Sequence, residues 1–251
     1  MLPIISIGPL AIPAYPLFLL LAFWAGMWLA ARQAGRLGLD GDHIYSAGLY
    51  GLIAGIIGAR LWFVLSHWEN YASDITQAFS LSRSALSIGE GVIVAGLVVL
   101  IYLYRSEMPV GLFIDVIAPG LALAVAIANI GALLGGEWLG APSNVPWAVE
   151  IAETARHPIQ IYEAIAGLNI LAVLSILRVY RPWPGFHFWL FVTLYACSRL
   201  ILEIFRARPV LIGDGFIAAQ IVALITIVVA LAVMAYNFNQ ITLSEANSTA
   251  S

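Results

Sequence analysis

Four polar residues recur at helical spacing in an otherwise apolar stretch around residue 200, namely Tyr195, Arg199, Glu203 and Arg206. At about 100° per residue, their spacings of 4, 4 and 3 place all four within about 80° on one helix face. Charged side chains are costly to bury in an apolar helix, so their presence needs a reason. Guanidinium groups bind phosphate oxygens through paired hydrogen bonds, and this face therefore predicts a site for an anionic group. The alternative is an ion-paired stripe that only holds helices together.

Further polar groups interrupt the other apolar runs. Arg60 stands within one run, and Asp115 with Pro119 lies in another, where a polar helix entry and a proline kink are the simpler interpretation. Glu137 follows two glycines that allow a tight backbone turn, and Asn129 precedes them. For Glu137, a glutamate exposed at the membrane interface is the alternative.

The last group contains an imidazole, an amide, a phenol and a carboxylate at the start of an apolar run. Its members are His157, Gln160, Tyr162 and Glu163. Such a set can line a polar site, whereas capping and anchoring of the following helix is the alternative for His157.

Composition places these groups in a membrane. The 251-residue chain is 62% hydrophobic and 10% charged, with a mean hydropathy of +0.95, which predicts an all-α polytopic membrane protein. Seven transmembrane helices are expected, over residues 10–31, 44–66, 91–104, 110–134, 158–177, 185–205 and 215–236. The third covers only about 21 Å of a core about 30 Å thick, so it must extend back through Glu90 or cross a thinned bilayer.

The positions of the arginines predict how the chain crosses the membrane. Arg32 and Arg36 follow the first span, which predicts a periplasmic N-terminus and a cytoplasmic C-terminus. Residues 1–240 are expected to form a single transmembrane domain, and residues 241–251 a polar cytoplasmic tail. Other arginines fall on the outer half and are interpreted as functional residues near the outer leaflet: Arg60, Arg83, Arg156, Arg199, Arg206 and Arg208.

Two outer segments and one glycine-rich face complete this organisation. Residues 67–90 are expected to form an external loop or a surface-lying helix, and residues 135–157 the longest external loop. Gly51, Gly55 and Gly58 lie near one face of the second span, which predicts close approach of a neighbouring helix.

Several classes of protein and site are disfavoured. A net charge of −3 argues against nucleic-acid binding. The single cysteine, Cys197, excludes an internal disulfide and a cysteine-based metal site. The sequence has no HExxH spacing, no GxSxG elbow and no Gly-rich phosphate loop, so neither a metal nor another cofactor is expected. The lack of an internal repeat counts against a transporter built from inverted halves.

From about Tyr15 to Gln220, the polar groups resemble the motifs of the bacterial prolipoprotein diacylglyceryl transferases. Tyr15 is similar to a tyrosine at the start of that family's first span, and Gln220 to the glutamine that begins its last helix. Residues 58–61 (GARL) are similar to G-x-R-L, and residues 115–119 (DVIAP) to D-x-x-A-P. Residues 136–140 (GEWLG) resemble the end of the family's central signature.

Two longer motifs make the resemblance specific. Residues 157–163 (HPIQIYE) match H-P-[ST]-Q-x-Y-E at every position except Ile159. Residues 195–206 (YACSRLILEIFR) match Y-x-x-x-R-x-x-x-E-x-x-R completely.

The chain also departs from the family pattern. Asn129 stands where the central signature has an arginine, and Ala132 and Gly135 stand where it has asparagines. The family's histidine falls near Val94 or Ala95, where this chain has neither histidine nor tyrosine.

The resemblance implies transfer of a diacylglyceryl group from phosphatidylglycerol to the lipobox cysteine thiol of a prolipoprotein, with glycerol phosphate leaving. The expected partners are phosphatidylglycerol, prolipoprotein signal peptides and the bilayer. The expected location is the bacterial cytoplasmic (inner) membrane, with several crossings and a site near the outer leaflet. A thiolate must attack, and positive charge must stabilise the departing phosphate.

The resemblance also suggests roles for the polar residues. Arg199 and Arg206 are expected to bind the lipid phosphate, with Glu203 orienting them and Tyr195 shaping the pocket. Thiol deprotonation falls to Glu137, to His157 or to a lipid phosphate oxygen. The remaining expected substrate-binding residues are Tyr15, Arg60, Asn129, Gln160, Tyr162 and Glu163.

Three alternatives remain open. A diverged paralogue would use a different lipid donor or acceptor, as the lost arginine and histidine suggest. A non-catalytic protein would bind phospholipid without turnover. A transporter would need a charged path on the cytoplasmic half, whereas the polar residues gather on the outer half.

Overall fold

A computed structural model describes residues 3–7, 10–71, 87–151, 153–207, 209–212 and 215–249. The chain divides into two compact units. The first comprises Met1–Gln33 and Ile114–Ser251, and the second comprises Ala34–Phe113. The expectation of a single domain over residues 1–240 stays a prediction.

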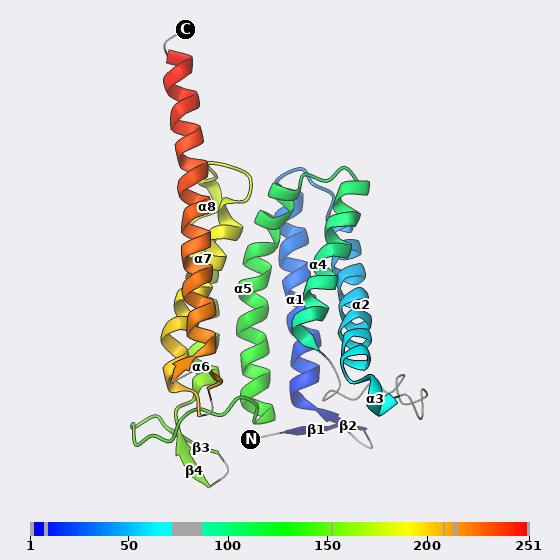
Figure 1. Ribbon diagram of the computed structural model, residues 1–251, viewed down its shortest axis with the longest axis vertical. Helices are drawn as coiled ribbons and strands as arrows, with labels where there is room; N and C mark the ends of the chain where they lie inside the picture. The colour runs from blue at the N-terminus through cyan, green and yellow to red at the C-terminus, as the bar shows by residue number, and fades with distance from the viewer. Residues whose placement is uncertain are drawn as a thin grey trace. The chain divides into compact units, whose positions relative to one another are not determined.

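The first unit is built from long helices, with short hairpins before α1, between α5 and α6, and between α7 and α8 (Figure 1). Its helices are α1 (Ala14–Arg36), α5 (Val110–Gly135), α6 (Ile159–Ile176), α7 (Phe186–Leu202) and α8 (Ala218–Thr249). Two 3₁₀ turns continue α6 and α7, namely η3 (Leu177–Val179) and η4 (Glu203–Phe205). Antiparallel hairpins pair β1 (Ile4–Ile7) with β2 (Leu10–Pro13), β3 (Val149–Ile151) with β4 (Thr154–Arg156), and β5 (Leu211–Ile212) with β6 (Phe216–Ile217).

The core of the first unit lies where α5, α6 and α7 meet. Ala118 and Ala122 of α5, Ile170 and Leu174 of α6, and Phe191 of α7 are buried together. Small side chains on α5 let the neighbouring helices approach closely, as is common for helices in membranes. This packing holds α6 and α7 side by side, and these two helices carry most of the residues described below.

Asp115 caps the start of α7 from the neighbouring helix α5. Its carboxylate is 1% exposed, and it accepts hydrogen bonds from the backbone amides of Gly185 over 2.8 Å, His187 over 2.7 Å and Phe188 over 3.2 Å. The first amides of a helix have no partner within the helix, and their partial positive charge favours an anion. Asp115 is therefore structural, as the sequence suggested, but it caps another helix and does not begin its own.

The second unit packs two helices against each other. It contains α2 (Gly41–Ser66), the short α3 (Trp68–Tyr71) and α4 (Ile88–Arg105). A Cβ on Gly58 would lie 2.7 Å from the Cβ of Val94, and one on Gly51 would lie 2.9 Å from a methyl group of Val99. The predicted close approach at the glycine face of the second span is confirmed, and α4 is the partner helix.

The helices agree with a polytopic all-α membrane protein. Among the described residues, six helices are long and apolar enough to cross a membrane by length and composition: α1, α2, α5, α6 with η3, α7 with η4, and α8. The helix at the expected third span, α4, begins at Ile88 and so extends back through Glu90. The count of seven spans and the direction in which the chain crosses stay predictions.

Several expected boundaries need correction. Residues 10–13, expected to open the first span, form strand β2, because they pair with the isoleucine-rich strand β1, and β-branched residues favour strands. The expected loop at 135–157 contains the β3–β4 hairpin, and α3 lies in the segment 67–90. Residues 72–86 of that segment, including Arg83, lie outside the described residues. α8 remains helical through Thr249, so the region expected as a tail continues the last helix.

Candidate functional site

Two arginines and two glutamates form a closed set of ion pairs, which we call the arginine–glutamate ring. Arg199 donates from Nη1 to Glu163 Oε1 over 2.5 Å and from Nη2 to Glu203 Oε2 over 2.6 Å. Arg206 donates from Nη2 to Glu163 Oε1 over 2.7 Å and from Nε to Glu203 Oε2 over 3.0 Å. One oxygen of each glutamate accepts from both arginines, and the ring carries no net charge.

The predicted single helix face is wrong at Arg206. α7 ends at Leu202, the η4 turn follows, and Arg206 has an extended backbone with φ −80° and ψ 142°. A 3₁₀ turn has about three residues per turn, so side chains three positions apart lie almost over one another. Arg206 therefore still reaches Glu203, although it has left the helix.

The four side chains of the arginine–glutamate ring are mostly buried, so the ring supports the fold as well as forming a polar surface. The side chains of Glu163 and Glu203 are 8% and 5% exposed, and those of Arg199 and Arg206 are 23% and 16% exposed. The ring joins α6 to the end of α7, so the helix-holding role considered from the sequence is real. The four bonds of the ring do not use Nε of Arg199 or Nη1 of Arg206, so both arginines keep donors outside the ring.

An apolar pocket of about 420 Å³ lies beside Arg199, between α7 and α8. Apart from Tyr195, Arg199 and Thr226, its lining is apolar and includes Phe191 and Val222. Mostly apolar pockets with a few polar groups are typical ligand sites. Tyr195 thus lies where the sequence expected it, one helical turn from Arg199 on a pocket wall.

The chain after α5 fixes the backbone of Arg206. An isolated antiparallel bridge joins Gly140 to Arg206, and next to it the Ala141 amide donates to the Phe205 carbonyl over 2.7 Å. A Cβ on Gly140 would lie 1.9 Å from the backbone oxygen of His157, so only glycine fits between these segments. Packing therefore requires a glycine at position 140, which is the last glycine of the segment that resembles the central signature.

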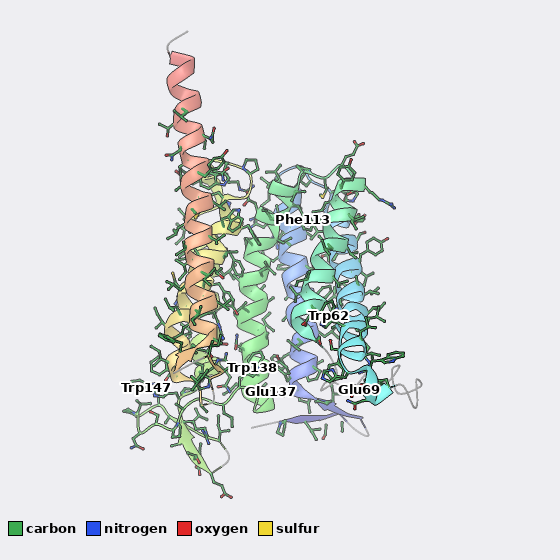
Figure 2. All side chains as sticks on the ribbon, viewed as in Figure 1. Trp62, Glu69, Phe113, Glu137, Trp138 and Trp147 are labelled. Carbon is green, nitrogen blue, oxygen red and sulfur yellow. The ribbon has the colours of Figure 1, made fainter. Side chains whose placement is uncertain are left out.

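Trp138 covers one side of Arg206, with the guanidinium carbon 5.6 Å from the ring centroid. Tyr15 of α1 is 6% exposed and packs edge-on against Trp138, with centroids 5.6 Å apart. Glu137 and Trp138 lie at the end of α5 nearest the β3–β4 hairpin (Figure 2). Tyr15, which was predicted to shape the pocket, thus contacts Trp138, and Trp138 contacts Arg206. Trp138 was not among the site residues predicted from the sequence.

Gln160 ties the start of α6 to the turn after α5. Its side chain is 1% exposed, and its amide nitrogen donates to the backbone carbonyls of Glu137 over 2.6 Å and Trp138 over 3.3 Å. These bonds hold the turn that carries both residues. Glu137 itself is half-buried, and its predicted catalytic role stays a prediction.

His157 lies in an aromatic cluster beside the ring and does not cap α6, whose N-cap residue is Pro158. Its Nδ1 is 3.2 Å from the Tyr162 hydroxyl, which also accepts a hydrogen bond from Trp147 Nε1 over 2.6 Å. The His157 ring packs against Phe205, with centroids 4.8 Å apart. The structure therefore brings His157 and Tyr162 against the residue that precedes Arg206.

Asn129 and Arg60 have other surroundings. Asn129 is 5% exposed, and its Nδ2 donates to the Val125 carbonyl over 2.9 Å. The Oδ1 atom of Asn129 has no hydrogen-bond partner among the described residues. Asn129 and Gln160 both line a small crevice of about 200 Å³. Arg60 belongs to the second unit, where it is buried and its guanidinium carbon lies 5.4 Å from the ring centroid of Tyr71. Their roles as site residues stay predictions.

A second pocket of about 300 Å³, which we call the arginine pocket, lies beside Arg206. It is lined by Trp138, Leu139, Arg156, Arg206 and Ala207. Arg156 was counted among the outer arginines but was not selected as a site residue. Its position directly before the HPIQIYE motif is the feature of the sequence that could have identified Arg156 as a site residue.

Together these features suit binding of an amphipathic anion. Arginine donors can hold a phosphate, and an apolar pocket beside them can hold hydrocarbon. Within the described part of the chain, no group of three or more His, Cys, Asp or Glu residues is arranged to hold a metal ion.

Comparison with known proteins gives the family. The family model described as prolipoprotein diacylglyceryl transferase matches residues 3–236. A phosphatidylglycerol–prolipoprotein diacylglyceryl transferase of Clostridioides difficile is 28% identical over 203 residues, covering 81% of this chain and 82% of its own. Those of Corynebacterium diphtheriae and Thermus thermophilus are each 29% identical, covering 89% and 88% of this chain and 88% and 92% of their own. Since the family model spans nearly the whole chain, the ring residues included, the chain belongs to the prolipoprotein diacylglyceryl transferase family.

Proposed function

We propose that this protein transfers the diacylglyceryl group of phosphatidylglycerol to the lipobox cysteine thiol of a prolipoprotein. The observation that carries the proposal is the arginine–glutamate ring, which presents Arg199 to an apolar pocket and Arg206 to a pocket that contains a second arginine, Arg156. A phospholipid has the same division, because its acyl chains are apolar and its headgroup is anionic. Membership of the family supports the same reaction.

The ring explains how positive charge can be held ready for the reaction. Attack of the thiolate on the glyceryl carbon expels a phosphate ester, on which negative charge develops. Glu163 and Glu203 fix both guanidinium groups before substrate arrives, so no reorganisation is needed when that charge appears. Glu203 then orients the arginines, and Tyr195 and Tyr15 shape the surroundings.

The thiol proton must leave before attack. Glu137, His157 and a phosphate oxygen of the lipid are the candidate acceptors. Glu137 also contributes to the polar lining in this proposal. The protein acts in the bacterial inner membrane near the outer leaflet, with a periplasmic N-terminus, where it meets prolipoprotein signal peptides.

The test is transfer of labelled diacylglyceryl from phosphatidylglycerol to a lipobox peptide by the full-length protein in lipid nanodiscs. Loss of one oxyanion-stabilising group lowers turnover by about 10²–10³-fold, and Arg199→Ala is expected to do so. Arg178→Ala is the matched control, since Arg178 lies exposed on η3 and is expected to leave turnover unchanged. Full activity in a folded Arg199→Ala variant would remove the role proposed for that residue.

A second candidate is a diverged transferase with another lipid donor or acceptor, or a protein that binds phospholipid without turnover. It is favoured by Asn129, which stands where the family has an arginine and leaves its Oδ1 unpaired within the described residues. Lipid that copurifies with the protein while no labelled product forms from phosphatidylglycerol would favour this candidate over the transferase proposed above.

A further inference from the structure

The arginine pocket contains a positive charge that the arginine–glutamate ring does not balance. Two arginines and two glutamates make the ring neutral, so the ring alone offers an anion donors but no net charge. Arg156 adds one positive charge to the lining of the pocket that also contains Arg206. Within the described residues, no carboxylate lies within ion-pair distance of Arg156.

Local structure holds Arg156 at this pocket. On β4 it pairs with Val149 of β3, and an isolated bridge joins it to Pro142. Its Nη1 donates to the Gly140 carbonyl over 3.1 Å, so it is linked to the segment that pairs with Arg206. Glu150 is one position along from the partner Val149, so its side chain points to the opposite face of the hairpin and is exposed.

The side chain of Arg156 retains unused hydrogen-bonding capacity. Its Nε is buried and has no acceptor among the described residues. Buried donors are nearly always paired in folded proteins, so an unpaired one at a pocket wall needs an explanation such as a bound group. Arg206 lines the same pocket, its two bonds within the ring use Nε and Nη2 and so leave Nη1 out of the ring, and Trp138 covers one side of that guanidinium group.

We infer that the arginine pocket binds the glycerol phosphate part of the lipid donor, and that Arg156 supplies its uncompensated positive charge. The inference rests on the proposed function and names where the leaving group goes. It assigns hydrocarbon to the apolar pocket beside Arg199 and the glycerol phosphate to the arginine pocket beside Arg206. Arg206, which belongs to both the ring and the arginine pocket, then lies between the two parts of the lipid.

The step balances without a further reactant. The cysteine sulfur forms a bond to the glyceryl carbon, and the bond from that carbon to the phosphate oxygen breaks. The electron pair of the broken bond stays on the phosphate oxygen, and the thiol proton is taken up by a base and ends on the glycerol phosphate. The free monoester carries about −1.5 to −2 at neutral pH, whereas the phosphodiester of the lipid carries one charge, so Arg156 favours the product form more strongly.

The experiment compares Arg156→Gln and Arg156→Lys with the wild type and with Arg178→Gln as a matched control. Full-length protein is placed in phosphatidylcholine nanodiscs, and binding of sn-glycerol 1-phosphate, inorganic phosphate and glycerol is measured by calorimetry. In parallel, the KM for phosphatidylglycerol and the product-inhibition constant of glycerol phosphate are measured. The KM reports the headgroup carried by lipid, and the inhibition constant reports the free phosphate ester.

Loss of a charged hydrogen-bonding group is expected to weaken glycerol phosphate binding about 10–100-fold in Arg156→Gln. Arg156→Lys keeps the charge and is expected to retain most of the affinity, while Arg178→Gln matches the wild type. The inhibition constant should rise more than the KM, and glycerol should not bind in any variant. The inference would be overturned if Arg156→Gln bound glycerol phosphate as tightly as the wild type. It would also be overturned if the Gln and Lys variants lost the same affinity for glycerol phosphate and the same thermal stability as each other.

Failure of the inference and failure of the proposed function give different results. If the wild type transfers diacylglyceryl and Arg156→Gln has the same KM and the same product-inhibition constant, the inference is overturned and the proposed function stands. Glycerol phosphate binding that depends on Arg156 in a protein without transfer supports the pocket and counts against the function.

Discussion

Replacement of Glu203 separates the structural role of the arginine–glutamate ring from its charge. Oε2 of Glu203 accepts from both arginines, over 2.6 Å and 3.0 Å, and the side chain is 5% exposed. A glutamine can place its amide oxygen at the Oε2 position, so Glu203→Gln keeps both hydrogen bonds and loses only the negative charge. Glu203→Ala loses both bonds and leaves the two arginines with one carboxylate.

The expected magnitudes follow from this geometry. Hydrogen bonds with an ionised acceptor are roughly twice as strong as neutral ones, so Glu203→Gln is expected to lower the free energy of unfolding by about 1–2 kcal/mol. Breaking a buried ion pair by removing one partner costs about 3–5 kcal/mol, which is the loss expected for Glu203→Ala. The arginines are partly exposed, so water lowers the cost toward the smaller end of that range.

The functional effect has the opposite sign. Glu203→Gln changes the ring from neutral to a charge of +1, so it is expected to bind glycerol phosphate more tightly while it unfolds more easily. Unfolding in detergent micelles followed by tryptophan fluorescence, together with calorimetry of glycerol phosphate binding, measures both quantities. Glu150→Gln, on the exposed face of β3, is the control and is expected to change the unfolding free energy by less than about 0.5 kcal/mol.

Two results would refute this reasoning. Equal destabilisation by Gln and Ala would mean that the two hydrogen bonds to Oε2 do not support the fold. Weaker glycerol phosphate binding in Glu203→Gln would mean that the net charge of the ring does not act on the anion.

Two further predictions concern the elements that hold the site. Asp115→Asn should lower the free energy of unfolding by about 2–3 kcal/mol, because the asparagine amide lacks the negative charge and has one acceptor oxygen fewer at the start of α7. A loss below about 0.5 kcal/mol in detergent unfolding would contradict the capping role. Gly140→Ala should reduce transfer at least about tenfold and destabilise by about 1–3 kcal/mol, because the new Cβ would meet the His157 backbone oxygen and displace the segment whose bridge holds the Arg206 backbone. Gly35→Ala, with nothing within 4 Å of its Cβ position, is the matched control, and wild-type transfer in Gly140→Ala would show that the bridge to Arg206 is dispensable.

Much of the helical architecture could be predicted because a membrane span requires a long apolar run. The helices α2, α5, α6 and α7 begin and end within a few residues of the predicted spans. The hairpins could not be predicted in this way, since each strand is only two to four residues long and has little periodicity of its own. The helical tail of α8 was missed because its polar composition conceals a helix that continues an apolar one.

The candidate site divides along similar lines. The spacing of Tyr195, Arg199 and Glu203 identified one polar helix face, because helical period alone brings such residues together. Glu163 was selected from its motif, but its pairing with both arginines joins positions 36 and 43 residues apart, which no local pattern indicates. Trp138 and Arg156 were not selected, since their proximity to Arg206 arises from pairing between distant loop segments.

The sequence by itself determined that this is a membrane protein with charged residues where charge is costly, and its motifs indicated the family and an anion site. Only the tertiary structure decided which charges neutralise one another. Helical period brings Arg199 near Glu203, but the packing of α6 against α7 adds Glu163, and strand pairing positions Arg206 and Arg156. Electrostatic interactions depend on distance in space and on burial, so the charge left free to meet a phosphate could be identified only once the chain was folded.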